Sequence, residues 1–388
     1  MDLTRLRETI EPLLPHAVAL RREFHAHPER SGEERETRAR VVRELTALGI
    51  EVHLFEGCQS VMGVMRNGEG PCVAIRADMD ALPIAEETGL PFASENPGVM
   101  HACGHDVHLA LALGSAAWFS AHRDSWRGTV KWLFESEEET VGGGQRMVAQ
   151  GCMRNPPVDA VLGQHMNPNY PTGTFYARPG FTSGSSDELR LTVTGSACHG
   201  AYPQRGVDAI VVTAQVVGAL QTLISRSISP FEPAVLTFGV IQGGTAENIV
   251  CDEVTLRGTL RTLTPETETF LLERIRRTAE GVAAAMGARA ALEVFPSYRP
   301  VYNEPALYET VAAQAERILG RERMVLQPAP SLGVESFSYF LKETPGVYYD
   351  LGCGVGTALH TPTFHVDEAV IPLGIEMQVA SALAIMRQ

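Results

Sequence analysis

Residues 107–134, VHLALALGSAAWFSAHRDSWRGTVKWLF, decide the fold class. The first half, Val107–Ser120, is rich in Ala and Leu and predicts a buried helix. The last part, Val130–Phe134, is a short apolar run that predicts a buried strand. Similar runs occur upstream, at Val73–Arg76, and downstream, at Ala160–Gly163. Alternating strands and helices predict an α/β domain with a mainly parallel sheet flanked by helices.

Further helices are expected on either side of this region. Residues 3–27 and 34–48 carry apolar residues at helical spacing, and Gly49 ends the second of these helices. The α/β pattern resumes after Pro300, and a helix from about residue 367 closes the chain. These segments are expected to cover the sheet.

The character of the sequence changes after Tyr176. Residues 178–186 (RPGFTSGSS) are small and linker-like. Beyond them the periodicity predicts helices at about 208–225 and 266–286 and strands at 188–194, 235–241, 254–260 and 291–295. We therefore expect a discontinuous domain of residues 1–178 and 296–388, and a smaller α+β domain of residues 179–295 inserted into it.

Composition excludes several classes of protein. The chain has 388 residues and a net charge of −14, which argues against general binding of nucleic acid, because that needs a basic face. No apolar run approaches the roughly 20 residues of a membrane helix, and the N-terminus does not resemble a signal peptide. The seven cysteines are odd in number and widely spread, which indicates a cytoplasmic protein without a disulfide framework.

The densest group of reactive side chains is Met100–His108 (MHACGHDVH), directly before the first predicted buried helix. Cys103 and His105 lie two residues apart, so an extended segment can direct both at one ion. A thiolate and an imidazole suit zinc and related metals. By itself the segment fits equally well a buried cysteine beside surface histidines.

Carboxylates follow two of the predicted strands. Asp80 comes after Val73–Arg76, where it either accepts the second N–H of a ligand histidine or caps the following turn. Glu135–Glu139 (ESEEE) comes after Val130–Phe134. Two adjacent glutamates can divide the work at a metal site, one as ligand and one as proton acceptor. The alternative for Glu135–Glu139 is a solvated acidic loop.

Two more histidines complete the candidate set. His165 ends the predicted strand near residue 160, and His360 lies in the C-terminal part. Each of them alone is more typical of an ordinary histidine than of a ligand. Together with the cysteine and the carboxylates, they supply as many ligands as two metal ions need.

At this point the sequence resembles the M20 metallopeptidase family, in its branch of hippurate hydrolases and N-acyl amino acid amidohydrolases. The resemblance extends over nearly the whole chain. The segments that carry it are FHAHPE (24–29), RADMDALP (76–83), MHACGHDVH (100–108), EE (138–139), GQH (163–165), HGAYP (199–203), GGTAEN (243–248) and LHTPTF (359–364).

The resemblance implies a centre of two divalent metal ions, zinc or manganese, with cobalt and nickel as further candidates. It implies that Cys103 bridges the two ions. The implied ligands are Cys103, His105, Glu139, His165 and His360.

The resemblance also assigns roles outside the ligand set. Glu138 corresponds to the general base and Asp80 to the carboxylate that orients a ligand histidine. His199 corresponds to a residue that reaches the partner's site in a homodimer, and Asn248 and Arg261 to residues near the substrate carboxylate. Residues 179–295 then form a lid and dimerisation domain. The implied reaction is hydrolysis of N-acyl amino acids, with a small molecule as substrate.

The sequence departs from the family pattern at five positions. Where the branch has Gln-Pro-Ala-Glu-Glu, this chain has Glu135–Glu139, which adds the charges of Glu135 and Glu137. Cys198 takes the place of a small residue, and Ser336 that of a common Asp. The extra charges are expected to raise the pKa of Glu138 or to disfavour anionic substrates.

Three alternatives remain open. A dipeptidase or carboxypeptidase would use the same metal centre, and a non-catalytic relative would keep the ligands without the base. The segment GCGVG (352–356) follows a predicted strand as in dinucleotide-binding oxidoreductases, but Thr357 replaces the third glycine and LHTP follows instead of a helix.

Overall fold

The computed structural model describes residues 5–140 and 142–387, and the chain divides into two compact units. The unit boundaries fall a few residues after the predicted domain boundaries at 178 and 295. Residues 330–335, which were expected in the first domain, belong to the second unit. Unit 1 comprises Met1–Thr182, Tyr302–Ala329 and Ser336–Gln388, and unit 2 comprises Ser183–Val301 and Pro330–Glu335.

Unit 1 contains an eight-stranded sheet in the order β1-β2-β4-β3-β5-β16-β6-β15. The central strands β4, β3, β5 and β16 run parallel, whereas β1 with β2, β2 with β4, and β16 with β6 pair antiparallel. The prediction of a mainly parallel sheet is therefore confirmed. The strands are β1 (Glu51–Leu54), β2 (Val61–Asn67), β3 (Cys72–Asp78), β4 (Gly128–Glu135), β5 (Ala160–Asn167), β6 (Phe175–Ala177), β15 (Met324–Leu326) and β16 (Gly346–Gly352).

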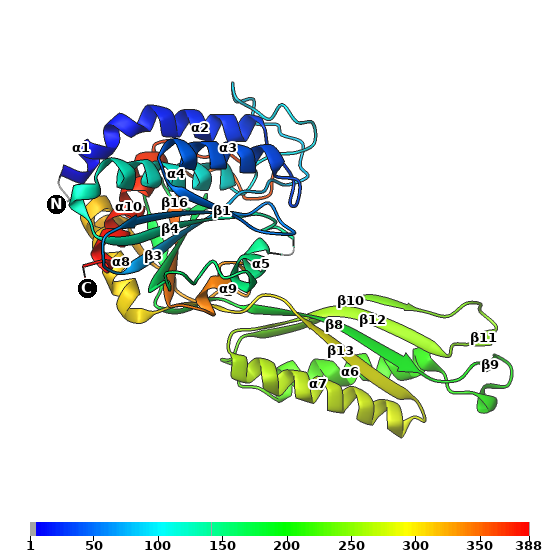
Figure 1. Ribbon diagram of the computed structural model, residues 1–388. Coiled ribbons are helices and arrows are strands. Elements are labelled where there is room, and N and C mark those ends of the chain that lie inside the picture. Colours follow the sequence, from blue (N-terminus) through cyan, green and yellow to red (C-terminus); the bar gives the residue numbers. More distant parts are fainter. Residues whose placement is uncertain (1–4, 141, 388) are drawn as a thin grey trace. The chain divides into compact units, whose positions relative to one another are not determined.

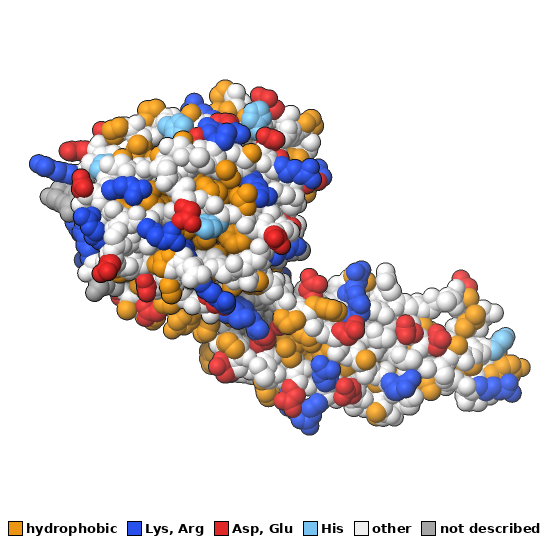
Figure 2. Space-filling model, viewed as in Figure 1, with side chains coloured by type: hydrophobic (Ala, Val, Ile, Leu, Met, Phe, Trp, Pro, Cys, Tyr) orange, Lys and Arg blue, Asp and Glu red, His pale blue; other side chains and the backbone are white. Residues whose placement is uncertain are grey.

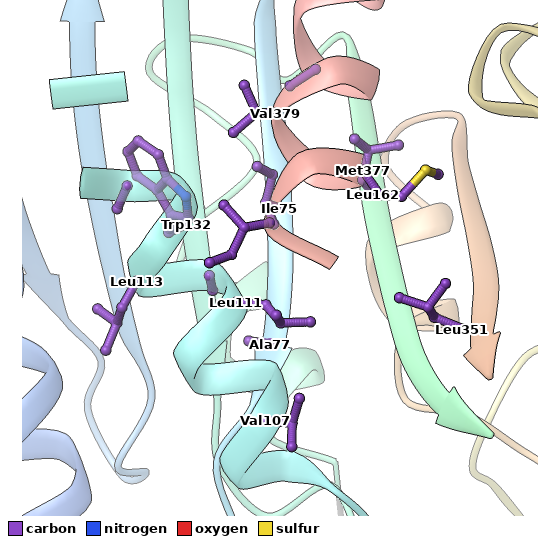
Figure 3. Close-up of a cluster of buried hydrophobic side chains, with 14 of the residues drawn as sticks. Ile75, Ala77, Val107, Leu111, Leu113, Trp132, Leu162, Leu351, Met377 and Val379 are labelled. Atoms are coloured by element: carbon purple, nitrogen blue, oxygen red, sulfur yellow. The ribbon is translucent and has the colours of Figure 1, made fainter. Parts of the chain in front are cut away.

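Helices cover this sheet on both sides, with α2, α3 and α4 on one side and α5 and α9 on the other (Figure 1). Two of the helices, α4 (His105–Ala121) and α10 (Val370–Ile385), are buried along nearly their whole length. Figure 3 shows Leu111 of α4 and Val379 of α10 beside Ile75 of β3. Each such buried side chain contributes about 1.5–3 kcal/mol to stability. The remaining helices are α1 (Leu6–Ile10), α2 (Leu14–Ala26), α3 (Arg35–Ala47), α5 (Gly143–Ala149), α8 (Pro305–Leu319) and α9 (Ser338–Leu341).

Two expectations for unit 1 are corrected. The helix expected over residues 3–27 is broken into α1, a 3₁₀ turn and α2, because Pro12 and Pro15 each lack a backbone N–H. Residues 3 and 4 of that expected helix lie outside the described residues. The dinucleotide-binding alternative is wrong, because residues 353–369, which follow β16, form no helix.

Unit 2 contains a four-stranded antiparallel sheet in the order β10-β12-β8-β13. Figure 1 shows helices α6 (Ala209–Arg226) and α7 (Pro265–Ala285) on one face of this sheet. The predicted α+β architecture is therefore observed. The strands are β8 (Ser185–Thr194), β10 (Ala234–Gly243), β12 (Glu253–Thr262) and β13 (Arg289–Pro296), with the short strands β9 (Cys198–His199) and β11 (Ile249–Val250) paired beside them.

The expected linker at 178–186 is instead mostly strand. β7 (Gly180–Ser183) and the first residues of β8 occupy it. Its small residues allow close approach of backbone, because a Cβ at Gly184 would come within 2.8 Å of the Thr262 carbonyl oxygen. Composition alone does not separate this use of small residues from flexibility.

Contrary to expectation, one helix of the described residues, α6, is long and apolar enough to cross a membrane by length and composition. Its buried residues, among them Ala209, Val212, Val216 and Leu220, recur on one face and pack in the core of unit 2. Core helices of globular domains meet the same criterion. On the face shown in Figure 2, acidic and basic side chains are interspersed over both units.

Candidate metal centre

Neighbouring strands of unit 1 deliver polar side chains to one edge of the sheet. β3 ends at Asp78 and β4 ends at Glu135, and these two strands run parallel, as does β5 beside β3. The first residue of α4, His105, lies here too, with Nε2 3.6 Å from Oδ2 of Asp78. Ligands of open α/β sheets bind beyond the carboxyl ends of the strands, so this edge is the place to look for a site.

Cys103 lies between two histidines that are distant from it in the sequence. Its Sγ is 3.4 Å from Nε2 of His165 and 3.4 Å from Nε2 of His360. The ligand atoms of Cys103, His105 and His165 lie within 4.8 Å of one another, and those of Cys103, Glu139 and His360 form a second such group. The structure therefore brings all five predicted ligands together, and Cys103 belongs to both groups.

Backbone carbonyl groups fix the tautomers of two of these histidines. Nδ1 of His105 donates to the carbonyl oxygen of Asp80 at 2.8 Å, and Nδ1 of His165 donates to that of Met166 at 2.8 Å. Because a carbonyl oxygen only accepts, Nδ1 of each ring carries a proton, and Nε2 is the nitrogen left to bind a metal ion. Nε2 of His165 is 3.4 Å from Sγ of Cys103, and Nε2 of His105 is 3.9 Å from Oε1 of Glu139.

His108 is a near neighbour that does not take part. Its Nε2 accepts from the backbone N–H of Met166 at 3.0 Å, and its Nδ1 donates to Oδ1 of Asp78 at 2.6 Å. Burial lowers the pKa of His108 to about 4, so it is neutral at physiological pH. With both ring nitrogens engaged, His108 links β5 to β3 rather than binding a metal.

The position of Asp80 differs in detail from the expectation. The atom that accepts from His105 is the Asp80 backbone carbonyl, whereas the carboxylate Oδ1 is 3.4 Å from Nδ1 of that histidine. Oδ2 of Asp80 accepts from Ser31 Oγ at 2.6 Å and from the backbone N–H of Glu139 at 3.0 Å. Asp80 therefore supports both a histidine and a carboxylate of the predicted ligand set.

The residues present fit divalent metal ions. Nε2 of His105 is buried and has no hydrogen-bond partner among the described residues. It lies 3.9 Å from Oε1 of Glu139, which is 3.3 Å from Nε2 of His360. A buried nitrogen without a partner is costly, and a cation between these atoms removes that cost. A thiol with imidazoles and a carboxylate is a donor set for zinc or a related borderline metal.

The charges around the cluster also favour the binding of a cation. Burial opposes the charging of His105, but the negative charges of Asp78 and Cys103 raise its pKa well above the ordinary value. Burial also raises the pKa of the Cys103 thiol. Surroundings that draw a proton to His105 also attract a cation, and metal binding would release protons from both side chains.

Two of the departures from the family pattern meet at Arg76, which is buried in unit 1. Its guanidinium donates to Oε2 of Glu135 at 2.7 Å, to Oγ of Ser336 at 2.7 Å and to Asp78. The charge of Glu135 is therefore paired with that of Arg76.

Glu137, the other added charge, is paired as well. Its carboxylate forms an ion pair with Arg146 on α5. Glu138, the predicted base, belongs to a third group with His105 and Glu139, and its Oε1 accepts from the backbone N–H of Ser336 at 3.4 Å. Glu135 is paired with Arg76 and Glu137 with Arg146. The positive charge of each arginine offsets the repulsion that these two carboxylates exert on Glu138.

The backbone at His360 is unusual. Its φ is +60°, a left-handed conformation that residues other than glycine adopt rarely. Its N–H donates to the carbonyl oxygen of Ala102 at 2.8 Å, which ties the His360 loop to the segment that carries Cys103. Such strain is concentrated at functional sites, where the surrounding structure holds it.

The other predicted site residues belong to unit 2. His199 is on β9, which pairs with β11, and the N–H of Gly200 donates to the carbonyl oxygen of Asn248 at 2.7 Å. His199 and Asn248 are therefore neighbours, and both are exposed. Arg261 lies near the far end of β12, where it pairs with Ser186, and is separate from them.

Sequence reasoning missed several residues that support this centre. His108 and Arg76 were quoted within motifs but given no role, and Glu34 was not singled out. The only local signal of His108 and Arg76 is a polar residue inside or beside an apolar segment, and Glu34, within the polar run 29–40, has no such signal. Their partners are distant in the sequence, so spacing does not identify them.

The sequence was compared with known families and proteins. The sequence model of peptidase family M20/M25/M40 matches residues 74–384. The chain is 34% identical over 376 residues to N-acetyl-L-cysteine deacetylase of Bacillus subtilis. That alignment covers 95% of this chain and 89% of the deacetylase. It is also 34% identical over 385 residues to thermostable carboxypeptidase 2 of Saccharolobus solfataricus, with 96% of both chains covered.

A solved structure is similar over the whole length. It is a dinuclear metal-binding peptidase of the M20 family from Bacillus subtilis, with a TM-score of 0.86 and 30% sequence identity. The alignment covers 97% of this chain and 99% of that one. The fold and its two-unit architecture are therefore shared with a protein described as binding two metals.

Proposed function

The chain belongs to peptidase family M20/M25/M40 and is a hydrolase, and from this premise we propose that it cleaves the amide bond of N-acyl amino acids at a two-metal centre. The observation that carries the proposal is Cys103, whose thiol lies in two groups of ligand atoms at once. A deacetylase among the relatives supports the acyl amino acid as substrate.

The proposed ligands divide into two sets that share Cys103. One set is completed by His105 and His165, and the other by Glu139 and His360. Zinc and manganese are the proposed ions, with cobalt or nickel as substitutes, since this donor set accepts all of them. Bound ions would polarise the amide carbonyl and lower the pKa of the attacking water.

Glu138 is the proposed proton carrier. Water adds its oxygen to the acyl carbon, and Glu138 accepts the proton that the water loses. The C–N bond then breaks, and Glu138 passes the proton to the leaving nitrogen, so that a carboxylic acid and a free amino acid result. Asp80 keeps His105 oriented. Asn248 and Arg261 are proposed to bind the substrate carboxylate from different protomers, because they are separate within one chain. The carboxylate of Glu138 lies within 4.8 Å of the ligand atoms of His105 and Glu139, which is close enough for general acid–base catalysis at the centre.

We further propose a homodimer that forms through unit 2, the lid and dimerisation domain. β10 is an edge strand of its sheet and has no charged residue, and its Val235 and Ile241 are exposed. Uncharged, exposed edges of this kind favour pairing with another chain. In the dimer, His199 would donate a hydrogen bond to the oxyanion at the partner's centre.

Replacing His199 by Ala is expected to lower kcat about 100- to 1,000-fold, because one donor to the oxyanion is lost. Metal content should stay at that of the wild type, since His199 lies in unit 2, outside the proposed ligand set. Mixing this variant with Glu138→Gln should restore part of the activity, because mixed dimers then hold one intact site. Confirmed subunit exchange without recovery of activity would rule out a shared site.

The function is tested by amino acid release from N-acetyl, N-benzoyl and long-chain N-acyl amino acids and from dipeptides. The protein is first stripped with a chelator and then loaded with zinc or manganese. We expect activity to vanish on stripping and to return with metal, on an acyl amino acid in preference to dipeptides. Protein that binds two ions per chain but cleaves no member of the panel would contradict the proposal.

The second candidate is a carboxypeptidase, which one of the relatives at 34% identity supports. It would use the same ligands and base, so the site geometry does not separate the two. Efficient cleavage of dipeptides or blocked peptides in the same panel would favour it. Retention of both Glu138 and Glu139 argues against a non-catalytic relative.

A cytoplasmic location is part of the proposal. All seven cysteines are free, and six of them are buried. Free cysteines throughout a chain are typical of reducing compartments. A small molecule as substrate agrees with the net charge of −14 and with the mixed charges on the face shown in Figure 2, since nucleic acid binding needs a basic face.

A further inference from the structure

The backbone of the Glu135–Glu139 segment is held by side chains from other parts of unit 1. The N–H of Ser136 donates to Oγ of Ser60 at 3.1 Å. The N–H of Glu137 donates to Oε1 of Glu34 at 2.8 Å, and that of Glu139 donates to Oδ2 of Asp80 at 3.0 Å. Glu138 therefore lies between two backbone amides, each of which is bound by a carboxylate.

Glu34 has no role so far in the proposed chemistry. It directly precedes α3 and is fully buried, at 0% exposure. A carboxyl group is costly to bury, and Oε1 of Glu34 accepts from the N–H of Glu137, 103 residues away. This long-range contact, rather than capping of α3, is the feature that calls for an explanation.

The hydrogen bond to Glu34 stabilises an unusual backbone conformation at Glu137. Its φ is +61°, a conformation that a residue other than glycine keeps only when its surroundings enforce it. Its carbonyl oxygen accepts from the N–H of Gly142 at 2.8 Å, and its carboxylate pairs with Arg146. The bond to Glu34 adds the remaining restraint, on the N–H group.

The left-handed residue Glu137 comes directly before a turn of residues 138–140, which carries the next two side chains. In a regular strand, successive side chains alternate between faces, so Glu138 and Glu139 would point apart. Here their carboxylates instead lie in one group with His105, within 4.8 Å of one another. The turn therefore allows one carboxylate to be a ligand and its neighbour to stay beside it.

We propose that Glu34 is a positioning residue for Glu138: it fixes the turn at Glu137, while Asp80 fixes the amide of Glu139. The inference rests on the proposed role of Glu138 as proton carrier. Displacement of a reacting group by about 1 Å is enough to lower a rate about a hundredfold. Loss of the Glu34 contact should therefore appear in kcat rather than in substrate binding.

Two substitutions at Glu34 separate the acceptor from the charge. Glu34→Met keeps much of the volume but removes the acceptor, and kcat should fall about 10- to 100-fold with KM within about twofold of wild type. Glu34→Gln keeps a side-chain oxygen that accepts from Glu137, and kcat should stay within about threefold of wild type. Both variants should bind two metal ions per chain.

The matched control is Glu376→Met on α10. Glu376 is another buried carboxylic acid of unit 1, at 5% exposure, and burial raises its pKa. Among the described residues, no hydrogen bond or ion pair joins its side chain to the Glu135–Glu139 segment, so its replacement should change stability but leave kcat unchanged. An equal loss of kcat in Glu34→Met and Glu376→Met would show a general packing effect and overturn the inference.

Hydrogen exchange gives a readout that does not depend on activity. The segment that contains residues 136–140 should exchange faster in Glu34→Met than in wild type, and at the wild-type rate in Glu34→Gln and Glu376→Met. Unchanged exchange in Glu34→Met would overturn the inference even if activity changed. An inactive wild type with faster exchange in Glu34→Met would refute the proposed function but retain the positioning role.

Discussion

Replacing Glu138 by Gln is expected to lower kcat at least about a hundredfold, the range of general acid–base catalysis. An amide has the shape of the carboxylate but does not accept the proton of the attacking water. The backbone N–H of Ser336 would still find an acceptor in the amide oxygen. The fold and KM should therefore change little, and the measurement is kcat together with metal content.

Glu137→Gln provides the matched control for Glu138→Gln. It removes the neighbouring charge but leaves the proton carrier, and Arg146 would keep an oxygen acceptor. We expect kcat to stay within about tenfold of wild type, because Glu137 lies outside the ligand groups. Near-normal turnover in Glu138→Gln would show that another group carries the proton.

Replacing Cys103 by Ala is expected to have the second large effect, because its thiol belongs to both ligand groups. The chain should bind fewer than two ions, and kcat should fall at least about a thousandfold. This follows because bound metal supplies several kcal/mol to such reactions, and each 1.4 kcal/mol is about tenfold in rate. Metal analysis after dialysis, with kcat on the same sample, measures both effects.

Cys152→Ala is the control for Cys103→Ala. Cys152 is also fully buried in unit 1 but is absent from the ligand groups, so its loss should leave a cavity without a change in metal content. Retention of two ions and of activity in Cys103→Ala would exclude the shared-thiol arrangement. The two ions would then be bound separately, one by His105 and His165 and the other by Glu139 and His360.

The fold class could be predicted because the apolar runs that specify its central strands are short, local stretches of sequence. Val73–Arg76, Val130–Phe134 and Ala160–Gly163 are apolar runs, and they became the parallel strands β3, β4 and β5. A run of apolar residues specifies burial on both faces of a strand without reference to the rest of the chain. The strands β1, β2, β6 and β15 were not predicted. β1, β6 and β15 are only three or four residues long, but β2 carries the apolar run VMGVM and was missed in spite of it.

The stretch 178–186 shows where local signals mislead. Small residues indicate either a flexible linker or a close approach of backbone, and the sequence does not separate these uses. Here the neighbouring carbonyl of Thr262 requires glycine at position 184. That neighbour is 78 residues away, so the information was not in the segment itself.

Some residues of the site could likewise be predicted from the sequence, and others could not. The kinds of side chain, the resemblance and the order of the motifs predicted Cys103, His105, Glu139, His165 and His360, and the structure brings these five together. By contrast, His108 stands in the same motif and could not be told from a ligand. It is engaged by Asp78 and the backbone of Met166, which come from two different strands.

The α/β class, the inserted α+β unit, the family and the residue types of the centre could all be predicted from the amino-acid sequence. All of these depend on order and local pattern. Only the tertiary structure decided which nitrogen of His105 and His165 is available, that the Asp80 carbonyl orients His105, and that Arg76 and Arg146 pair with the added charges of Glu135 and Glu137. These depend on contacts between atoms that are distant in the chain, and hydrogen-bond partners are set by positions in space rather than by spacing in sequence.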